Sequence, residues 1–342
     1  MKFEKRAGEL PSIPVLRTGA DFPFETLIAC EQAAHALIDG ATRHASKTAL
    51  RALDAISRAW LAKWNHAHLA EIDRVAERMK RPGAYFLSVN YEWGCTVGVH
   101  PTADNTAAAL ARVLDWQTPG LGRHVIAAIV SGRSGTFVTL TWPGYTGILQ
   151  AMAPGRFSAA INQAPMPHRG GGIYPFDWLA NKLRVWQTPH ATPAHVLRVV
   201  FENALTFGAA RDQLISTPIA TPVIFSLAGT EPNELCIIER TEDDAYVHDG
   251  ANAAANAWQA PGWNGRERGE DNIGRVAQMS DACWRLRREH ATDFSWLSPP
   301  VLNDHTRLAL LCDARRGRVL AQGFEANGPA TAMLDLNLGT GS

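Results

Sequence analysis

The sequence predicts an α+β fold in which a helical N-terminal segment precedes a larger, strand-rich part. Three observations lead to this prediction. Apolar residues recur every three or four positions before residue 80, the period changes near residue 84, and short apolar runs separated by turns follow. Strands joined in hairpins, with helices inserted between them, favour sheets covered by helices in one compact unit.

The helical segment is predicted over residues 22–80. A helical repeat of apolar residues is clearest over 50–64 and over 69–79, and Arg81-Pro82-Gly83 ends it. Residues 84–89 form a short apolar run, which we interpret as a strand that leads into Gly94-Cys95.

The remainder is predicted to contain mostly strands. Gly132 and Gly135 bracket a hairpin turn between the first two of them. A helix is expected from Pro193, with Thr192 as its N-cap, and a second from Asp271 to Leu286. The predicted strands cover residues 124–130, 136–142, 156–162, 222–228, 234–239 and 307–313.

Composition narrows the possible functions. The 342 residues are 46% hydrophobic and carry 33 basic and 33 acidic side chains, so nothing attracts the chain to nucleic acid or to an anionic membrane surface. Five dispersed cysteines fit reduced thiols, and none of the 12 histidines has metal-ligand spacing, so we expect no metal and no cofactor. With no apolar stretch of membrane-spanning length and no signal-peptide pattern, we expect a cytoplasmic protein without integral membrane association.

Gly94-Cys95-Thr96 is the most informative motif. A cysteine at a chain start carries both an attacking sulfur and an amine that can act as its base. This interpretation requires a cut between Gly94 and Cys95, which would give fragments 1–94 and 95–342 that stay together. The alternative is a buried cysteine without chemistry, which is the more common role of an isolated cysteine.

Arg112 and Asp115 follow the motif among apolar neighbours. Arg112 could stabilise a thiolate of Cys95, and Asp115 could hold its freed amine, whereas a surface ion pair is the simpler interpretation. A strand places residues 112 and 115 on opposite faces, so a bend or bulge is expected if both are to reach Cys95.

Further candidates are polar or aromatic side chains at turns and strand ends. Asn256 suits an oxyanion hole, although an asparagine there also suits a simple turn. Candidates for substrate contact are Trp142, Tyr145, Asn162, Gln163 and Trp258.

In this order, the segments resemble the N-terminal-nucleophile amide hydrolases of the acid ceramidase and N-acylethanolamine acid amidase group, in the choloylglycine hydrolase superfamily. The resemblance runs from Ile72 to Phe324 and rests on residues 87–92, 94–96, 112–116, 137–149 and 155–162. It implies a four-layer αββα sandwich, a cut before Cys95 and an oxyanion role for Asn256. It also implies a site arginine, with Arg275 as first choice and Arg268 as second. Gln163 departs from the acid ceramidase branch, which carries glutamate there.

The resulting hypothesis is a self-processed cysteine amidase that hydrolyses a linear amide, such as an N-acyl amine with an apolar acyl chain, through a Cys95 thioester. An acyltransferase that uses the same acyl-enzyme is a close alternative. A lipid-binding relative without catalysis is the alternative from another class.

Overall fold

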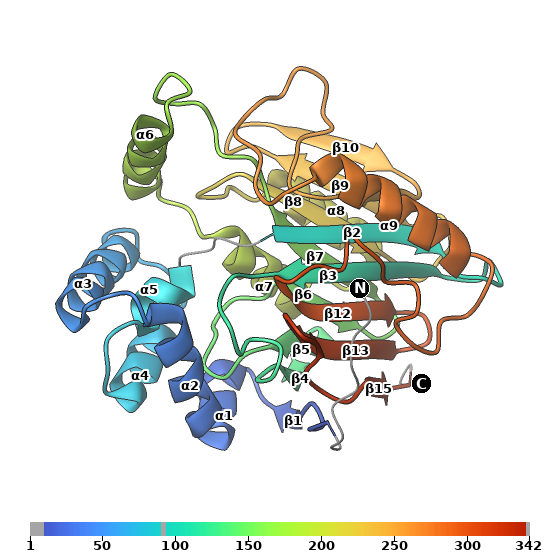
Figure 1. Ribbon diagram of the computed structural model, residues 1–342, viewed down its shortest axis with the longest axis horizontal. Helices are drawn as coiled ribbons and strands as arrows, with labels where there is room; N and C mark the ends of the chain where they lie inside the picture. The colour runs from blue at the N-terminus through green and yellow to red at the C-terminus, as the bar shows by residue number, and fades with distance from the viewer. Residues whose placement is uncertain (1–9, 90–93, 340–342) are drawn as a thin grey trace.

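The computed structural model describes residues 10–89 and 94–339, so positions 90–92 of the quoted approach to Cys95 lie outside the described residues. Two sheets form the centre of this part of the chain (Figure 1). The first has the order β1-β4-β5-β6-β7-β8-β9-β10, and the second β11-β2-β3-β12-β13-β14, with β15 paired to β13.

The first sheet contains β1 (Val15–Thr18), β4 (Ile126–Gly132), β5 (Gly135–Thr141), β6 (Gln150–Ala153), β7 (Phe157–Gln163), β8 (Val223–Ala228), β9 (Leu235–Arg240) and β10 (Ala245–Asp249). The second contains β2 (Gly94–Pro101), β3 (Ala108–Asp115), β11 (Asn252–Ala254), β12 (Thr306–Asp313), β13 (Arg318–Glu325), β14 (Gly328–Pro329) and β15 (Leu334–Asn337). All six predicted strands are present within two residues of their expected bounds.

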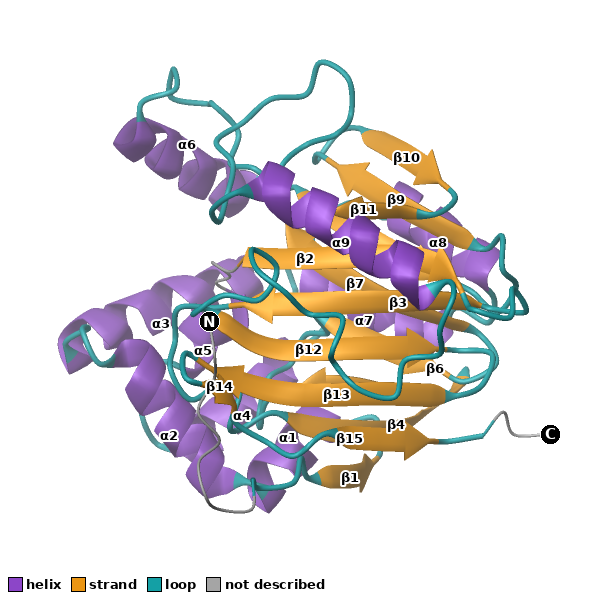
Figure 2. Cartoon of the chain, turned by 45° about the vertical axis from the view of Figure 1, so that its right-hand side comes forward, coloured by secondary structure: helices purple, strands orange, loops and turns teal. Residues whose placement is uncertain are grey.

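Helices cover the outer faces of both sheets. Helix α9 (Asn272–Leu286) packs on β2 and β11, and Figure 2 shows it lying across these strands. Helices α7 (Pro193–Asn203) and α8 (Phe207–Ser216) pack on β7, β8 and β9 of the other sheet. Because β2 and β3 also pack on β7 and β8, the layers run helix, sheet, sheet, helix, which confirms the predicted αββα sandwich.

The N-terminal segment lies beside the sheets and contains α1 (Phe22–Ala29), α2 (Glu31–Thr42), α3 (Lys47–Lys63), α4 (Leu69–Met79) and α5 (Ala84–Val89) (Figure 1). It is not purely helical, because β1 pairs in parallel with β4 at the edge of the first sheet. This segment is thus joined to the rest of the fold through a shared sheet.

The strand predicted over residues 84–89 is wrong, because this stretch is helix α5. The carboxylate of Asp54, on α3, accepts the backbone N–H groups of Gly83 at 2.7 Å and Phe86 at 3.0 Å. The free N–H groups of a first helical turn need such acceptors. A contact from a distant helix therefore selects the conformation of an apolar run that is ambiguous by itself.

Helix α6 (Tyr174–Gln187) exposes its apolar side chains to solvent, whereas most amphipathic helices bury them. Its apolar stripe faces solvent, with Phe176 60%, Leu179 51% and Leu183 54% exposed. On its opposite side, the buried carboxylate of Asp177 accepts the N–H of Gly170 at 2.6 Å. Polar contacts with the preceding loop therefore hold the start of this helix, while near its end Val185 packs in an apolar cluster with Trp60, whose Nε1 donates to the carbonyl of Val185 at 2.8 Å.

Candidate active site

Gly94 and Cys95 are the first two residues of β2, where they pair with Asp115 and Leu114 of β3. Side chains alternate between the faces of a strand. Cys95 belongs to the apolar core between the sheets, whereas the next side chain, Thr96, reaches Arg275 of α9. Groups on both faces of the sheet can therefore contact the Gly94–Cys95 junction.

On the inner face, the thiol of Cys95 meets Arg112. The Nη2 of Arg112 donates to Cys95 Sγ at 2.9 Å, and its Nη1 donates to the carbonyl of Leu149 at 2.7 Å. Burial raises the pKa of Cys95 to about 11, although the Arg112 charge lowers it in part. The thiol is therefore protonated near neutral pH in the continuous chain.

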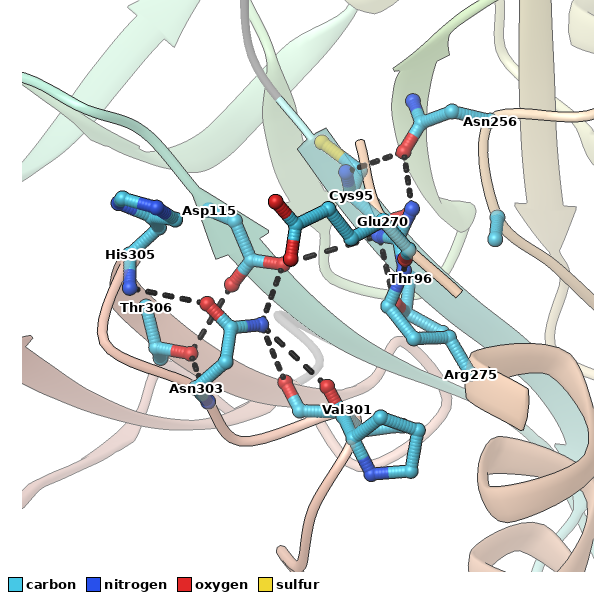
Figure 3. Close-up of polar contacts among 12 residues, drawn as sticks. Cys95, Thr96, Asp115, Asn256, Glu270, Arg275, Val301, Asn303, His305 and Thr306 are labelled. Atoms are coloured by element: carbon cyan, nitrogen blue, oxygen red, sulfur yellow. Dashed lines mark hydrogen bonds and ion pairs between the residues drawn. The ribbon is translucent and has the colours of Figure 1, made fainter. Parts of the chain in front are cut away.

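Asn256, beside the edge of β2, and Arg275, on the outer face, contact the backbone of Cys95 (Figure 3). The N–H of Cys95 donates to Asn256 Oδ1 at 2.8 Å, and Arg275 Nη1 donates to the carbonyl of Cys95 at 3.0 Å. Arg275 Nη2 also donates to Asn256 Oδ1 at 3.1 Å and to Asn272 Oδ1 at 2.6 Å. Arg268 donates instead to the carbonyl of Ala164 at 3.1 Å.

The close packing of α9 on β2 brings Arg275 to this place. A side chain at Gly98 would put its Cβ 2.2 Å from Cys283 Sγ of α9, so only glycine allows this approach. At the start of α9, Asp271 accepts the N–H of Gly274 at 3.0 Å and caps the helix.

Asn256 presents its oxygen, rather than its amide donor, to the junction. Its Nδ2 donates to the backbone carbonyl of Gln163 at 2.7 Å. The oxyanion role predicted for Asn256 therefore requires this donor to leave Gln163 and turn towards the reacting carbonyl. Asn162 is fully buried and donates to the carbonyls of Ala254 and Ala255, so it supports the strand that precedes Asn256.

Asp115 lies on the outer face, opposite Gly94. Its Oδ1 accepts from Thr306 Oγ1 at 2.9 Å and its Oδ2 from Asn303 Nδ2 at 3.0 Å, while Arg275 Nη1 lies 3.7 Å from Oδ2. Burial raises the pKa of Asp115, and these partners oppose that shift. Asn272, Asn303 and Thr306 were not identified from the sequence, because polar residues at a helix start or in a loop carry no distinctive pattern.

The bulge expected near residues 112–115 is wrong in its position. Pairing of β2 with β3 is regular from Gly94 to Pro101, whereas the register of β3 with its other neighbour, β12, shifts between Thr306 and Leu308. Arg112 and Asp115 do lie on opposite faces. Both reach the junction because it stands at a strand end, where the thiol and the backbone are approached from different sides.

A larger cleft of about 800 Å³, lined by both polar and apolar side chains, opens beside this junction. Gly94 and Asp115 line it, with Gln163, Arg268 and Arg275. Cys95 itself is fully buried, so the cleft reaches the Gly94 side of the junction but not the sulfur.

A separate apolar cavity of about 100 Å³ lies between the N-terminal helices and the strand-rich part. The N-terminal helices contribute Leu27, Ile38 and Val75 to its lining, and the strand-rich part contributes Trp142 and Tyr145. Trp116 borders both the cavity and the larger cleft. Trp258 packs edge-on against Trp263, with ring centroids 5.0 Å apart, and lines neither space.

Within residues 10–89 and 94–339, no three His, Cys, Asp or Glu side chains are grouped in a way that could hold a metal ion. None of the helices described there has both the length and the apolar character needed to cross a bilayer.

Comparison with known proteins identifies relatives of one kind, although no family model matches the sequence. The chain is 29% identical over 170 residues to an N-acylethanolamine-hydrolyzing acid amidase of Caenorhabditis elegans, with 48% of this chain and 44% of that protein aligned. It is 28% identical over 109 residues to acid ceramidase of Heterocephalus glaber, with 32% of this chain and 26% of that protein aligned. The predicted resemblance to the acid ceramidase and acid amidase group is confirmed.

The solved structure of the Caenorhabditis elegans acid amidase ortholog shares the fold. It superimposes with a TM-score of 0.52 at 20% identity, and the match covers 71% of this chain and 100% of that one. The sequence matches themselves span only about a quarter to a half of the two curated relatives, the acid amidase and the acid ceramidase.

Proposed function

We propose that the protein is a self-processed cysteine amidase that hydrolyses a linear amide, of the N-acyl amine or fatty acid amide class. The arrangement around one peptide bond carries this proposal. Arg112 contacts the thiol of Cys95, Asn256 binds the nitrogen of the Gly94–Cys95 bond, and Asp115 lies opposite Gly94. Relatives that are named acid amidase and acid ceramidase support the reaction class.

Self-processing starts with the attack of Cys95 Sγ on the carbonyl carbon of Gly94. The C–S bond forms, the C–N bond breaks, and the nitrogen of Cys95 takes up the thiol proton to become a free α-amine. Water then hydrolyses the thioester, which releases the carboxyl end of residue 94 and restores the thiol.

Hydrolysis of a substrate repeats this chemistry. The sulfur attacks the amide carbonyl while the α-amine of Cys95 accepts the thiol proton and passes it to the leaving amine. Asn256 Nδ2, once released from Gln163, would stabilise the oxyanion. Water resolves the thioester to a carboxylic acid.

The apolar cavity beside Trp116 is the proposed acyl site. Both prospective fragments line it, so fragment 1–94 must stay bound to form it. Its volume of about 100 Å³ is below the roughly 300–1,000 Å³ of typical ligand pockets, so a long acyl chain requires the helices to move apart.

All five cysteines are free thiols, which supports the proposed cytoplasmic location.

The decisive experiment is intact mass spectrometry under denaturing conditions after incubation across a range of pH. We expect fragments 1–94 and 95–342 from the wild type and a single chain from Cys95→Ala, with amide hydrolysis lost in the same variant. Cys236→Ala is the matched control, because this buried cysteine lies in the other sheet. A Cys95→Ala chain that is still cut would refute the proposal, and added amine acceptors would separate acyl transfer from hydrolysis.

A further inference from the structure

Asp115 is held by a small network that extends beyond the residues of the proposed reaction. Both of its carboxylate oxygens accept a hydrogen bond, one from Thr306 Oγ1 and the other from Asn303 Nδ2 (Figure 3). Asn303 lies in the loop that leads into β12, and Thr306 is the first residue of that strand. The backbone N–H of Trp116 ties this loop to the end of β3 by a 2.7 Å bond to His305 O.

The direction of each hydrogen bond is fixed by its neighbours. Asn303 Oδ1 accepts the N–H of His305 at 2.9 Å, so its Nδ2 must point to Asp115. Thr306 Oγ1 accepts the N–H of Asn303 at 3.0 Å, which leaves its own hydrogen for Asp115. Asp115 is therefore an acceptor at both oxygens, and acceptor-only bonding favours an ionised carboxylate.

We infer that Asn303 and Thr306 are positioning residues that keep Asp115 ionised and aimed at the Gly94–Cys95 junction. The inference rests on the proposed function and on the role expected for Asp115 from the sequence, that of holding the freed α-amine of Cys95. Asn303 and Thr306 would thereby set the lower pH limit of processing and of hydrolysis.

Burial raises the pKa of Asp115 and so favours its neutral form, whereas the hydrogen bonds from Asn303 and Thr306 lower this pKa. Other titratable groups also act on Asp115 from each surrounding element. They are Cys95 on β2, Arg112 on β3, Arg275 on α9, His305 just before β12 and Arg307 on β12, and Glu270 and Asp304 line the same cleft as Asp115. Asn303 and Thr306, by contrast, are neutral donors in direct contact with the carboxylate. They can therefore be changed without altering the charge of a proposed catalytic group.

The test compares four variants by the pH dependence of kcat/KM for a lauroyl amide. Thr306→Val removes one donor, and Asn303→Asp replaces the other with a second carboxylate. Thr306→Ser keeps the hydroxyl. Thr331→Val is the matched control, because this buried threonine also has a hydrogen-bonded hydroxyl, accepting from Gly323 N at 2.8 Å, but does not contact Asp115.

We expect Thr306→Val and Asn303→Asp to move the acidic limb upward by about one pH unit or more, with the larger shift in Asn303→Asp. Thr306→Ser and Thr331→Val should keep the wild-type limb. Slower variants with an unmoved limb would show a merely structural role and overturn the inference.

A second readout does not depend on activity. In the Cys95→Ala background, the pKa of Asp115 is followed by carboxyl carbon-13 NMR, with its signal identified by its loss in Asp115→Asn. The inference requires this pKa to rise in Thr306→Val and Asn303→Asp, and an unchanged value overturns it. A wild type that is neither cut nor active would refute the proposed function, and this titration would still decide the inference.

Discussion

The thiol of Cys95 experiences opposing influences from its immediate neighbours. Burial disfavours the thiolate and raises the pKa of Cys95, while the guanidinium of Arg112 at 2.9 Å favours the charged form. The guanidinium is itself fully buried, and its other hydrogen bond goes to a backbone carbonyl rather than to a carboxylate. Its charge therefore remains available to the sulfur.

Replacing Arg112 by Gln tests this balance. A hydrogen bond to a charged group contributes about 1.5–3 kcal/mol, so the rate of cutting at pH 7 should fall by about 10- to 150-fold. The measurement is the rate at which the 95–342 fragment appears in intact mass spectra. Arg156→Gln is the control, because this buried arginine binds the carbonyls of Phe201 and Ala204, far from Cys95 in the fold. An unchanged rate in Arg112→Gln would mean that the thiol does not depend on this charge.

At the scale of elements, the joint between the N-terminal helices and α7 contains three histidines whose rings are close together, with His68 stacked on His195 and His66 edge-on to His195. The ring of His195 lies 4.7 Å from that of His66 and 5.1 Å from that of His68. Burial lowers the pKa of His66 to about 4 and that of His68 to about 3, where the charge of Arg198 adds to the effect. Arg198 also forms an ion pair with Glu71 of α4 across the same joint.

Acid should therefore weaken this joint. The neutral histidines contribute stability that is complete above about pH 6.5, their unfolded pKa, and is lost as the pH falls towards their folded pKa values of about 4 for His66 and about 3 for His68. Burial raises the pKa of Glu71, which offsets part of the loss at the acidic end. We expect the Tm to fall between pH 7 and pH 5, and to fall less steeply in His66→Phe. The exposed His44→Gln is the control, and equal slopes in wild type and His66→Phe would contradict the assignment.

At the scale of the whole molecule, the sequence predicted the strands of the two central sheets but not all of the helices around them. Strands with apolar runs and clear turns, such as β4 and β5, were located from local pattern alone. The nature of α5 depends on Asp54, a contact about thirty residues away that no local pattern contains. Helix α6 was missed because its polar side, rather than its apolar side, faces the protein.

In the candidate site too, residues close together in the sequence were predicted, and residues brought in from far along the chain were not. Cys95, Arg112 and Asp115 were found because they are close in sequence and lie on paired strands. Asn303 and Thr306 meet Asp115 only because β12 adds to β3, a pairing between segments almost two hundred residues apart. Long-range pairing of this kind fixes which polar residues become neighbours, and a single sequence does not record it.

The outward stripe of α6 leads to a prediction about stability. Leu183 is 54% exposed, so Leu183→Ser should change the free energy of unfolding by no more than about 0.5 kcal/mol and should improve solubility. Leu197→Ser on α7 is the buried comparison, with an expected loss of about 2–5 kcal/mol. Denaturant unfolding measures both. A loss in Leu183→Ser similar to that in Leu197→Ser would mean that α6 is packed more tightly than its exposure indicates.

The parallel pairing of β1 with β4 has a consequence for a chain that has been cut after residue 94. Fragment 1–94 would then hold the large fragment at two separate places, the edge strand β1 and the histidine joint of α7. When one contact opens, the other keeps the partners at a high effective concentration, so the first closes again before the fragments separate. Dissociation would need both contacts to open together, and the cut protein would behave as a long-lived heterodimer even at high dilution.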